Sequence, residues 1–86
     1  MTGADAFERR VVDVVQQAVR AASGDMHIEV RADDTMETVP GWDSLTFMSV
    51  WSAINEAFGI DPDFDDAIHY ISLPALIEYL RSQQAP

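Results

Sequence analysis

The sequence predicts an all-α fold, a small helical bundle of three longer helices plus one short helix, with a long loop between the first two helices. Three separate segments repeat apolar residues at the three- and four-residue spacing of a helix with one buried face. No segment alternates apolar and polar residues over the length that a sheet requires. The 86 residues correspond to one domain, so we expect residues 1–86 to fold as a unit.

The first helix is expected over about residues 5–22. Asp5 and Glu8 stand near its start and Arg20 near its end, an order that suits the helix dipole. Gly24 supplies a stop signal directly after it. The predicted buried face consists of Phe7, Val11, Val14, Val15, Ala18 and Ala22.

Residues 23–43 show no sustained periodicity and are expected to form a loop. A connection of this length is uncommon inside a small domain and is often functional. Apolar residues recur along it and can hold it against the helices, which predicts an ordered loop. These residues are Ile28, Val30, Met36 and Val39.

The second helix is expected over about residues 44–58. Asp43 is the predicted N-cap, because a carboxylate there can accept hydrogen bonds from the free N–H groups of the first turn. Gly59 supplies the stop signal. One face carries the predicted core residues Phe47, Val50, Trp51, Ile54 and Phe58, and the opposite, exposed face carries Leu45, Met48, Ser49, Ser52 and Glu56.

Two further helices complete the predicted bundle. A short helix is expected over about residues 64–70, after an aspartate-rich segment. The last helix is expected over about residues 73–83, with Ser72 as its cap and Pro74 in its first turn, where a missing N–H costs little. Its predicted core residues are Leu73, Leu76, Ile77 and Leu80.

The composition excludes several classes of function. Fifteen acidic residues stand against five arginines, a formal net charge of −10, so the chain lacks the basic face that binds nucleic acid or an anionic membrane. There is no cysteine, which excludes a disulfide framework and a cysteine nucleophile. The first residues lack signal peptide features, and no apolar run approaches the roughly 20 residues of a membrane span. We therefore expect a cytoplasmic protein.

Ser44 is the candidate functional residue. It follows the predicted cap Asp43, between the long loop and the second helix. The N–H groups and the dipole at a helix start favour an anion, most often a phosphate, and a hydroxyl there faces outward to a modifying enzyme. An ordinary helix-start serine has the same local features, so the residues around Ser44 leave both interpretations open.

Other chemistry has weaker support. An EF-hand calcium loop starting at Asp61 would place Asp66 where glycine is needed and Ser72 where the bidentate glutamate is needed. The two histidines could complete a hydrolase triad with Ser44, but the sequence around this serine lacks the second glycine of a nucleophile elbow. We expect no metal site and no catalytic residue.

Three groups of residues share the spacing of a known family. They are Asp43-Ser44-Leu45 at the start of the second helix, Ala53-Ile54-Asn55-Glu56-Ala57-Phe58-Gly59-Ile60 at its end, and Ile77-Glu78-Tyr79-Leu80 near the C-terminus. Together with the long first loop and the short third helix, they resemble the acyl carrier proteins. The resemblance extends over about residues 7–82.

The resemblance implies that Ser44 receives a 4′-phosphopantetheine arm from coenzyme A, through a separate phosphopantetheinyl transferase that Asp43 contacts. The arm then holds an acyl or aminoacyl group as a thioester, and the protein is a carrier rather than an enzyme. The implied partners are that transferase, an acyltransferase or adenylating loading enzyme, and a ketosynthase or other acyl-processing enzyme. The implied partner surface is Leu45, Met48, Ser49, Ser52 and Glu56.

One departure from the family pattern bears on the pathway. Fatty-acid carriers usually place several carboxylates on the exposed face of the second helix, whereas Glu56 is the only acidic residue there. We therefore expect a discrete, monomeric carrier of polyketide or nonribosomal-type biosynthesis rather than of fatty acid biosynthesis. The alternative is an unmodified helical adaptor that binds a partner protein through residues 44–58. In either case, the bulk of Phe47 and Trp51 disfavours a large internal cavity.

Overall fold

The computed structural model describes residues 5–84 and confirms the all-α fold. Residues 1–4 and 85–86 of the predicted domain lie outside the described residues. No helix among the described residues is long and apolar enough to cross a membrane. The helices are α1 (Ala6–Ser23), α2 (Phe47–Phe58), the 3₁₀ helix η1 (Phe64–Ile71) and α3 (Leu73–Gln84).

α1 begins and ends within one residue of the predicted bounds. The Asp5 carboxylate caps it by accepting a 2.8 Å hydrogen bond from the Glu8 N–H. At the other end, Gly24 adopts φ 80° and donates its N–H to the Arg20 carbonyl oxygen. Both signals are therefore confirmed as the physical start and stop of the helix.

The buried face of α1 differs from the prediction at one end. Ala22 was expected in the core but is exposed, and Val19 is buried instead. Ala22 borders an open groove, because the small side chains at the end of α1 do not fill the space beside α2. The buried residues of the helix are Val11, Val15, Ala18 and Val19.

α2 begins at Phe47 rather than at the predicted Ser44. Residues 43–46 form a separate turn, because the Asp43 carboxylate and the Thr46 hydroxyl bond to the backbone of this short segment. The helix ends as predicted, at Gly59 with φ 63°. The long loop, residues 24–46, is accordingly two residues longer than expected.

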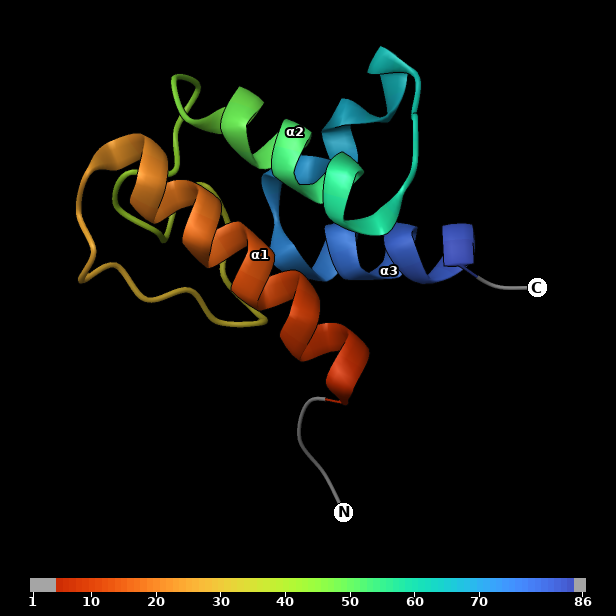
Figure 1. The fold of residues 1–86 in the computed structure, drawn as a ribbon, viewed down its shortest axis with the longest axis horizontal. Helices are drawn as coiled ribbons and strands as arrows, with labels where there is room; N and C mark the ends of the chain where they lie inside the picture. Colours follow the sequence, from red (N-terminus) through yellow and green to blue (C-terminus); the bar gives the residue numbers. More distant parts are fainter. Residues whose placement is uncertain (1–4, 85–86) are drawn as a thin grey trace.

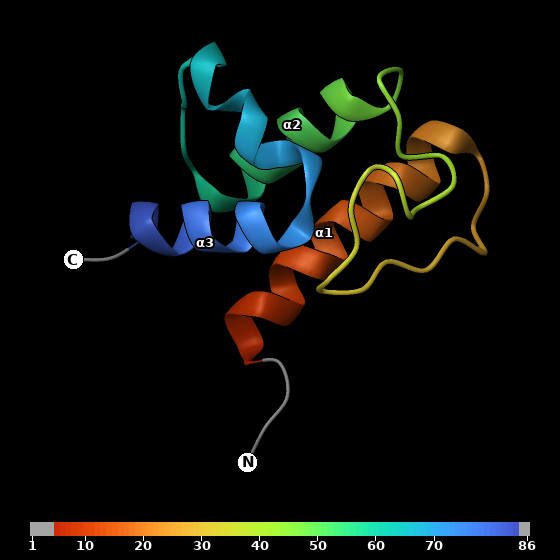
Figure 2. The same cartoon turned by 180° about the vertical axis from the view of Figure 1, so that it is seen from behind.

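The helices pack around one core, with α1 in contact with both α2 and α3 (Figure 1). Figure 2 shows from behind how the long loop runs along α1 before the chain enters α2. η1 contacts α2 and α3. The predicted core residues of the last helix are all buried, and the fully buried side chains are Val11, Val15, Val19, Trp42, Val50, Ile54, Tyr70, Leu73, Leu76 and Leu80.

The first half of the long loop is tied to α1. The Arg20 guanidinium donates a 2.7 Å hydrogen bond to the Ile28 carbonyl oxygen, and the Gln16 side chain accepts one of 2.9 Å from the Val30 N–H. Ile28, Val30 and Val39 are buried. These contacts confirm an ordered loop that its apolar residues hold against the helices.

The second half of the loop is tied to the junction of η1 and α3. The Met36 N–H donates to the Ile71 carbonyl oxygen at 3.0 Å, and the Leu73 N–H donates to the Asp34 carbonyl oxygen at 2.8 Å. An isolated bridge between the same two segments is the only β pairing in the described part of the chain. These bonds bring the end of the loop, with the turn at residues 43–46, beside η1.

Candidate functional site

Residues 43–46 form a turn that two side chains hold from both ends. The Asp43 Oδ1 atom accepts hydrogen bonds from the Leu45 N–H at 2.9 Å and from the Thr46 N–H at 3.2 Å. The Thr46 hydroxyl accepts one of 3.0 Å from the Asp43 N–H and donates one of 2.7 Å to the Gly41 carbonyl oxygen. This reciprocal arrangement resembles a capping box and fixes the backbone on both sides of Ser44.

Gly41 sets the direction from which the chain enters this turn. It adopts φ 90°, a left-handed conformation that favours glycine. A Cβ atom at this position would lie 2.9 Å from Ile28 Cδ1 and 3.3 Å from Ser23 Cβ. The chain therefore passes too close to α1 and the early loop for a larger residue.

Ser44 and Asp43 are both exposed on this turn. The Ser44 hydroxyl forms no hydrogen bond within residues 5–84, and neither does the Asp43 Oδ2 atom. The predicted outward orientation of the serine is thus confirmed. A hydroxyl held on a fixed turn and free of internal partners is accessible to a modifying enzyme.

The expected anion site at a helix start needs correction. The two N–H groups that follow Ser44 are already bonded to the Asp43 carboxylate, and α2 begins only at Phe47. Since those donors are occupied and a carboxylate stands beside them, the helix start gives Ser44 little affinity for an anion of its own. Ser44 therefore stands out by an accessible hydroxyl on a fixed turn, and not by anion binding.

A groove of about 730 Å³ begins at Ser44 and extends toward η1. Ile68 and Ile71 of η1 are 68% and 44% exposed, so this wall is apolar and open. The other wall includes Trp42, which is 1% exposed and whose indole N–H has no acceptor within the described residues. The lining residues are Thr35, Met36, Glu37, Trp42, Asp43, Ser44, Ile68, Ile71, Ser72 and Ala75.

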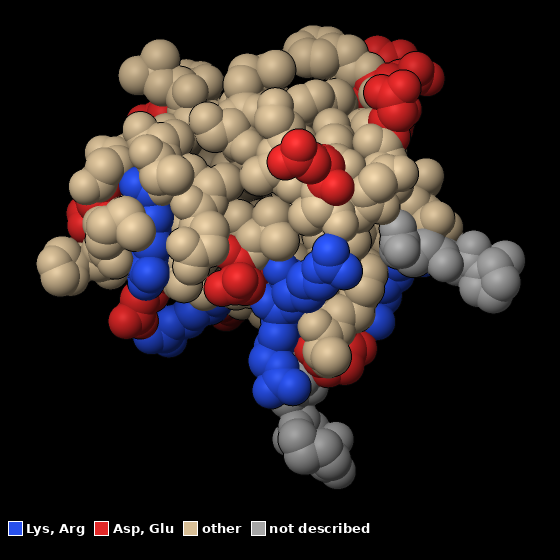
Figure 3. Space-filling model, in the orientation of Figure 1, with Lys and Arg blue, Asp and Glu red and all other residues tan. Residues whose placement is uncertain are grey.

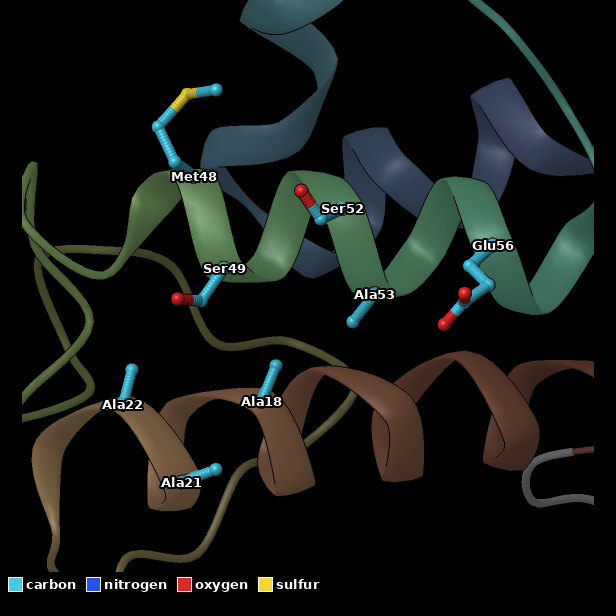
Figure 4. A pocket seen from close by; sticks show the side chains of 8 residues that line it. All are labelled: Ala18, Ala21, Ala22, Met48, Ser49, Ser52, Ala53 and Glu56. Atoms are coloured by element: carbon cyan, nitrogen blue, oxygen red, sulfur yellow. The ribbon is translucent and has the colours of Figure 1, made fainter.

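A second groove, of about 670 Å³, lies between α1 and α2 (Figure 4). It joins four of the five predicted partner residues, Met48, Ser49, Ser52 and Glu56, whereas Leu45 stands apart on the turn and is 88% exposed. The α1 half of this groove was not predicted. The only feature of the sequence that indicates this half is the small size of the side chains of Ala18, Ala21 and Ala22.

The fold supports neither a calcium loop at Asp61 nor a hydrolase triad that includes Ser44. Among residues 5–84, no three histidine, aspartate or glutamate side chains converge where they could hold a metal ion. The His69 ring stacks on the Tyr79 ring, with 4.7 Å between their centroids, and the Tyr79 hydroxyl donates to Asp66. His69 therefore belongs to the contact between η1 and α3 rather than to the neighbourhood of Ser44.

Comparison with known protein families identifies the family of the chain. The family model described as the phosphopantetheine attachment site matches residues 10–80. The chain belongs to this family. Its members are carrier domains with a covalently attached 4′-phosphopantetheine group, and they act as carriers rather than as enzymes. No match was found among curated proteins or among solved structures.

The residues around Ser44 fit the group that this family carries. The exposed hydroxyl would hold the phosphate of the arm, and the adjoining groove offers the apolar side chains of Ile68 and Ile71. When bound, the group supplies a thiol that takes cargo as a thioester.

Proposed function

We propose that Ser44 carries the 4′-phosphopantetheine arm and that the protein shuttles acyl or aminoacyl thioesters between biosynthetic enzymes. The observation that carries this proposal is an exposed hydroxyl, without a hydrogen bond among the described residues, in an Asp-Ser-Leu turn whose backbone is fixed on both sides. The family match supplies the chemical identity of the group.

The other serines offer poorer attachment sites. Ser23 and Ser72 accept hydrogen bonds from backbone N–H groups, and Ser82 donates one to a backbone carbonyl oxygen. Ser49 and Ser52 are exposed but lie within α2 and outside the Asp-Ser-Leu turn. Ser44 combines accessibility with the motif.

The attachment is a phosphoryl-type transfer from coenzyme A. The Ser44 oxygen forms a bond to the phosphorus atom that bears the pantetheine, and the P–O bond of the pyrophosphate breaks. The adenosine bisphosphate leaves with the bonding electron pair, and the serine proton passes to a base of the transferase. Asp43 adjoins the attacking oxygen, and its unpaired Oδ2 atom is available to the transferase or to a metal ion that the transferase holds.

Intact mass after incubation with coenzyme A and a broad-specificity phosphopantetheinyl transferase tests this proposal. The wild-type chain should gain the mass of one phosphopantetheine, whereas Ser44→Ala should gain none and keep the wild-type helicity. Ser82→Ala, which also removes an exposed serine hydroxyl but lies on α3 outside the proposed docking face, should be modified like the wild type. A gain that survives Ser44→Ala would refute the assignment, and no gain in the wild type would favour the unmodified adaptor.

We also propose that partner enzymes dock on the exposed face of α2, through Leu45, Met48, Ser49, Ser52 and Glu56. In Figure 3 the surface over α2 is mostly uncharged, and a cluster of acidic side chains lies at the upper right of the view. Because Glu56 is the only acid on this face, docking through apolar contacts is expected. This favours a carrier of polyketide or nonribosomal-type biosynthesis over one of fatty acid biosynthesis.

The proposed partners follow from the same chemistry. A phosphopantetheinyl transferase would install the arm, an acyltransferase or adenylating enzyme would load it, and a ketosynthase or other acyl-processing enzyme would use the thioester. Transfer rates with ketosynthases of polyketide and fatty acid origin distinguish the two pathways. A clear preference for the fatty acid enzyme would overturn the pathway proposed here.

A further inference from the structure

Thr46 is a buried polar residue next to the proposed attachment site. Among the serine, threonine, amide and charged side chains whose burial the structure describes, it alone is buried, with 6% exposure. Its hydroxyl accepts a 3.0 Å hydrogen bond from the Asp43 N–H and donates one of 2.7 Å to the Gly41 carbonyl oxygen. The bonds of this buried hydroxyl therefore go to the backbone of the segment that leads into Ser44.

The backbone N–H of Thr46 in turn holds the Asp43 side chain. It donates to the Asp43 Oδ1 atom at 3.2 Å, and the Leu45 N–H donates to the same oxygen at 2.9 Å. Two donors on one oxygen restrict rotation of the carboxylate, so Oδ2 is the oxygen left for a partner enzyme. Thr46 thus holds both the backbone and the side chain of the residue that precedes Ser44.

The Gly41 end of this link is fixed by packing. Gly41 adopts φ 90°, and a Cβ atom there would lie 2.9 Å from Ile28 Cδ1 and 3.3 Å from Ser23 Cβ. The chain at Gly41 therefore lies directly against the early loop and the end of α1. Through its hydroxyl, Thr46 connects the turn that carries Ser44 to this packed part of the structure.

We propose that Thr46 is a positioning residue for the modification of Ser44, because its hydroxyl holds the turn in the conformation that the phosphopantetheinyl transferase binds. The inference rests on the proposed attachment at Ser44. A side chain with 6% exposure does not offer a contact surface to the transferase or to coenzyme A. Thr46 therefore acts through the backbone of Asp43 and Ser44 and takes no part in bond making.

Loss of the hydroxyl is expected to weaken binding of the carrier to the transferase. A binding site that is formed only part of the time has its apparent dissociation constant raised by the inverse of that fraction. Without the Thr46 hydroxyl, the Asp43 N–H and the Gly41 carbonyl oxygen lose their bonds within the fold. We expect the turn then to be formed about one tenth of the time. Once bound, the transferase holds the turn in place, so the chemical step keeps its rate.

Steady-state kinetics of the modification, with the carrier as the varied substrate, test the proposal. Thr46→Val should raise KM about tenfold and leave kcat near the wild-type value. Thr46→Ser keeps the hydroxyl and should have a KM close to that of the wild type. Circular dichroism establishes that each variant is folded under the assay conditions.

Val11→Ala is the matched control for a general loss of stability. Val11 is fully buried in α1, so the substitution leaves a gap in the core. It lies twelve residues before Ser23, roughly 18 Å along the helix from the end that packs against Gly41. Val11→Ala should therefore lower stability and leave KM unchanged.

Three kinetic results would overturn the proposal. They are a wild-type KM in folded Thr46→Val, a loss confined to kcat, and a rise of KM in Val11→Ala or Thr46→Ser equal to that in Thr46→Val. An unchanged mass of the wild-type chain after incubation would instead refute attachment itself, and the role of Thr46 would fall with it. Intact mass therefore distinguishes the failure of one proposal from that of the other.

NMR relaxation of the unmodified wild-type chain tests the role of Thr46 without any substitution, and it applies even if Thr46→Val fails to fold. Backbone N–H order parameters of residues 43–46 should equal those of α1 and α2, about 0.85. Values below about 0.6 would show that the turn is not formed in advance and would overturn the proposal.

Discussion

Thr46 shows at the scale of one residue how the site depends on a side chain that was not among the predicted site residues. It is buried at 6% exposure, and its hydroxyl links the Asp43 N–H to the Gly41 carbonyl oxygen. The spacing of an acid three residues before a hydroxyl was the available sequence signal, because it allows a reciprocal cap. Without this link, the turn that carries Ser44 would lose one of its two side-chain supports.

Thr46→Val should lower the free energy of unfolding by about 1–3 kcal/mol, since it removes the hydroxyl and leaves the Gly41 carbonyl oxygen without that donor. Urea unfolding followed by circular dichroism measures the change. Thr46→Ser keeps the hydroxyl and serves as the control, with a smaller loss. A stability of Thr46→Val equal to that of the wild type would show that the hydroxyl does not support the turn.

The exposed face of α2 carries a prediction at the scale of one element. Met48→Glu should weaken docking of acyl-processing enzymes by about 1–2 kcal/mol, roughly tenfold, because it places a charge in an apolar contact. Met48 is 52% exposed, so stability should change little. Transfer rates from the loaded carrier provide the measurement.

Gln17→Glu is the matched control for that substitution, because it adds the same charge at an exposed position of α1 outside the groove. It should leave the transfer rates near the wild-type values. If both variants lose activity equally, net charge rather than the α2 face determines docking.

η1 is anchored by tyrosines whose ionisation links stability to pH. The buried Tyr70 hydroxyl donates to the Asn55 side chain, and burial, followed by the charges of Tyr79 and Asp66, raises the pKa of Tyr70 well above its usual 10.0. Burial and Asp66 also raise the pKa of Tyr79. A phenol with a raised folded-state pKa stabilises the fold fully below the unfolded pKa, and this contribution is lost as pH rises above it.

The free energy of unfolding should therefore fall above about pH 10. In the Tyr70→Phe variant, the free energy of unfolding should fall less steeply with pH. At pH 7 this variant should be less stable than the wild type by about 1 kcal/mol, because the Asn55 side chain loses its hydrogen-bond donor. Denaturant unfolding at a series of pH values tests both statements. An unchanged alkaline slope in Tyr70→Phe would exclude Tyr70 as the group responsible.

The charge of the whole molecule is concentrated in two segments. Residues 25–43 hold six acids and one arginine, and residues 61–66 hold four acids, so these segments account for nine of the ten net negative charges. One ion pair, between Arg81 and Asp5 at 2.8 Å, is present among the described residues, and it is exposed. The repulsion within the acidic segments is thus left largely uncompensated.

Added salt should therefore raise the thermal midpoint. Increasing ionic strength from about 0.01 M to about 0.15 M shortens the screening length from roughly 30 Å to 8 Å, which weakens the repulsion more than it weakens one exposed ion pair. Thermal melts at the two salt concentrations measure the effect. The double variant Asp61→Asn and Asp65→Asn should respond less, and a midpoint that falls with salt would contradict the expectation.

Local patterns in the sequence determined the helices, their glycine stops and the Asp-Ser-Leu motif. Each of these depends on neighbouring residues, such as the 3.6-residue period of α1 or the left-handed Gly24 and Gly59, so it can be read without knowing the fold. The family resemblance rested on the same local signals, and the family match over residues 10–80 confirms it.

Only the tertiary structure decided how these parts meet. It placed Ala21 and Ala22 beside the α2 face and brought Trp42 into a groove with Ile68 and Ile71. The physical reason is that each arrangement joins segments more than twenty residues apart, through packing and hydrogen bonds that no local pattern encodes. The sequence thus determined which residue could carry an arm, and the packing of the loop against η1 determined which groove lies beside that residue.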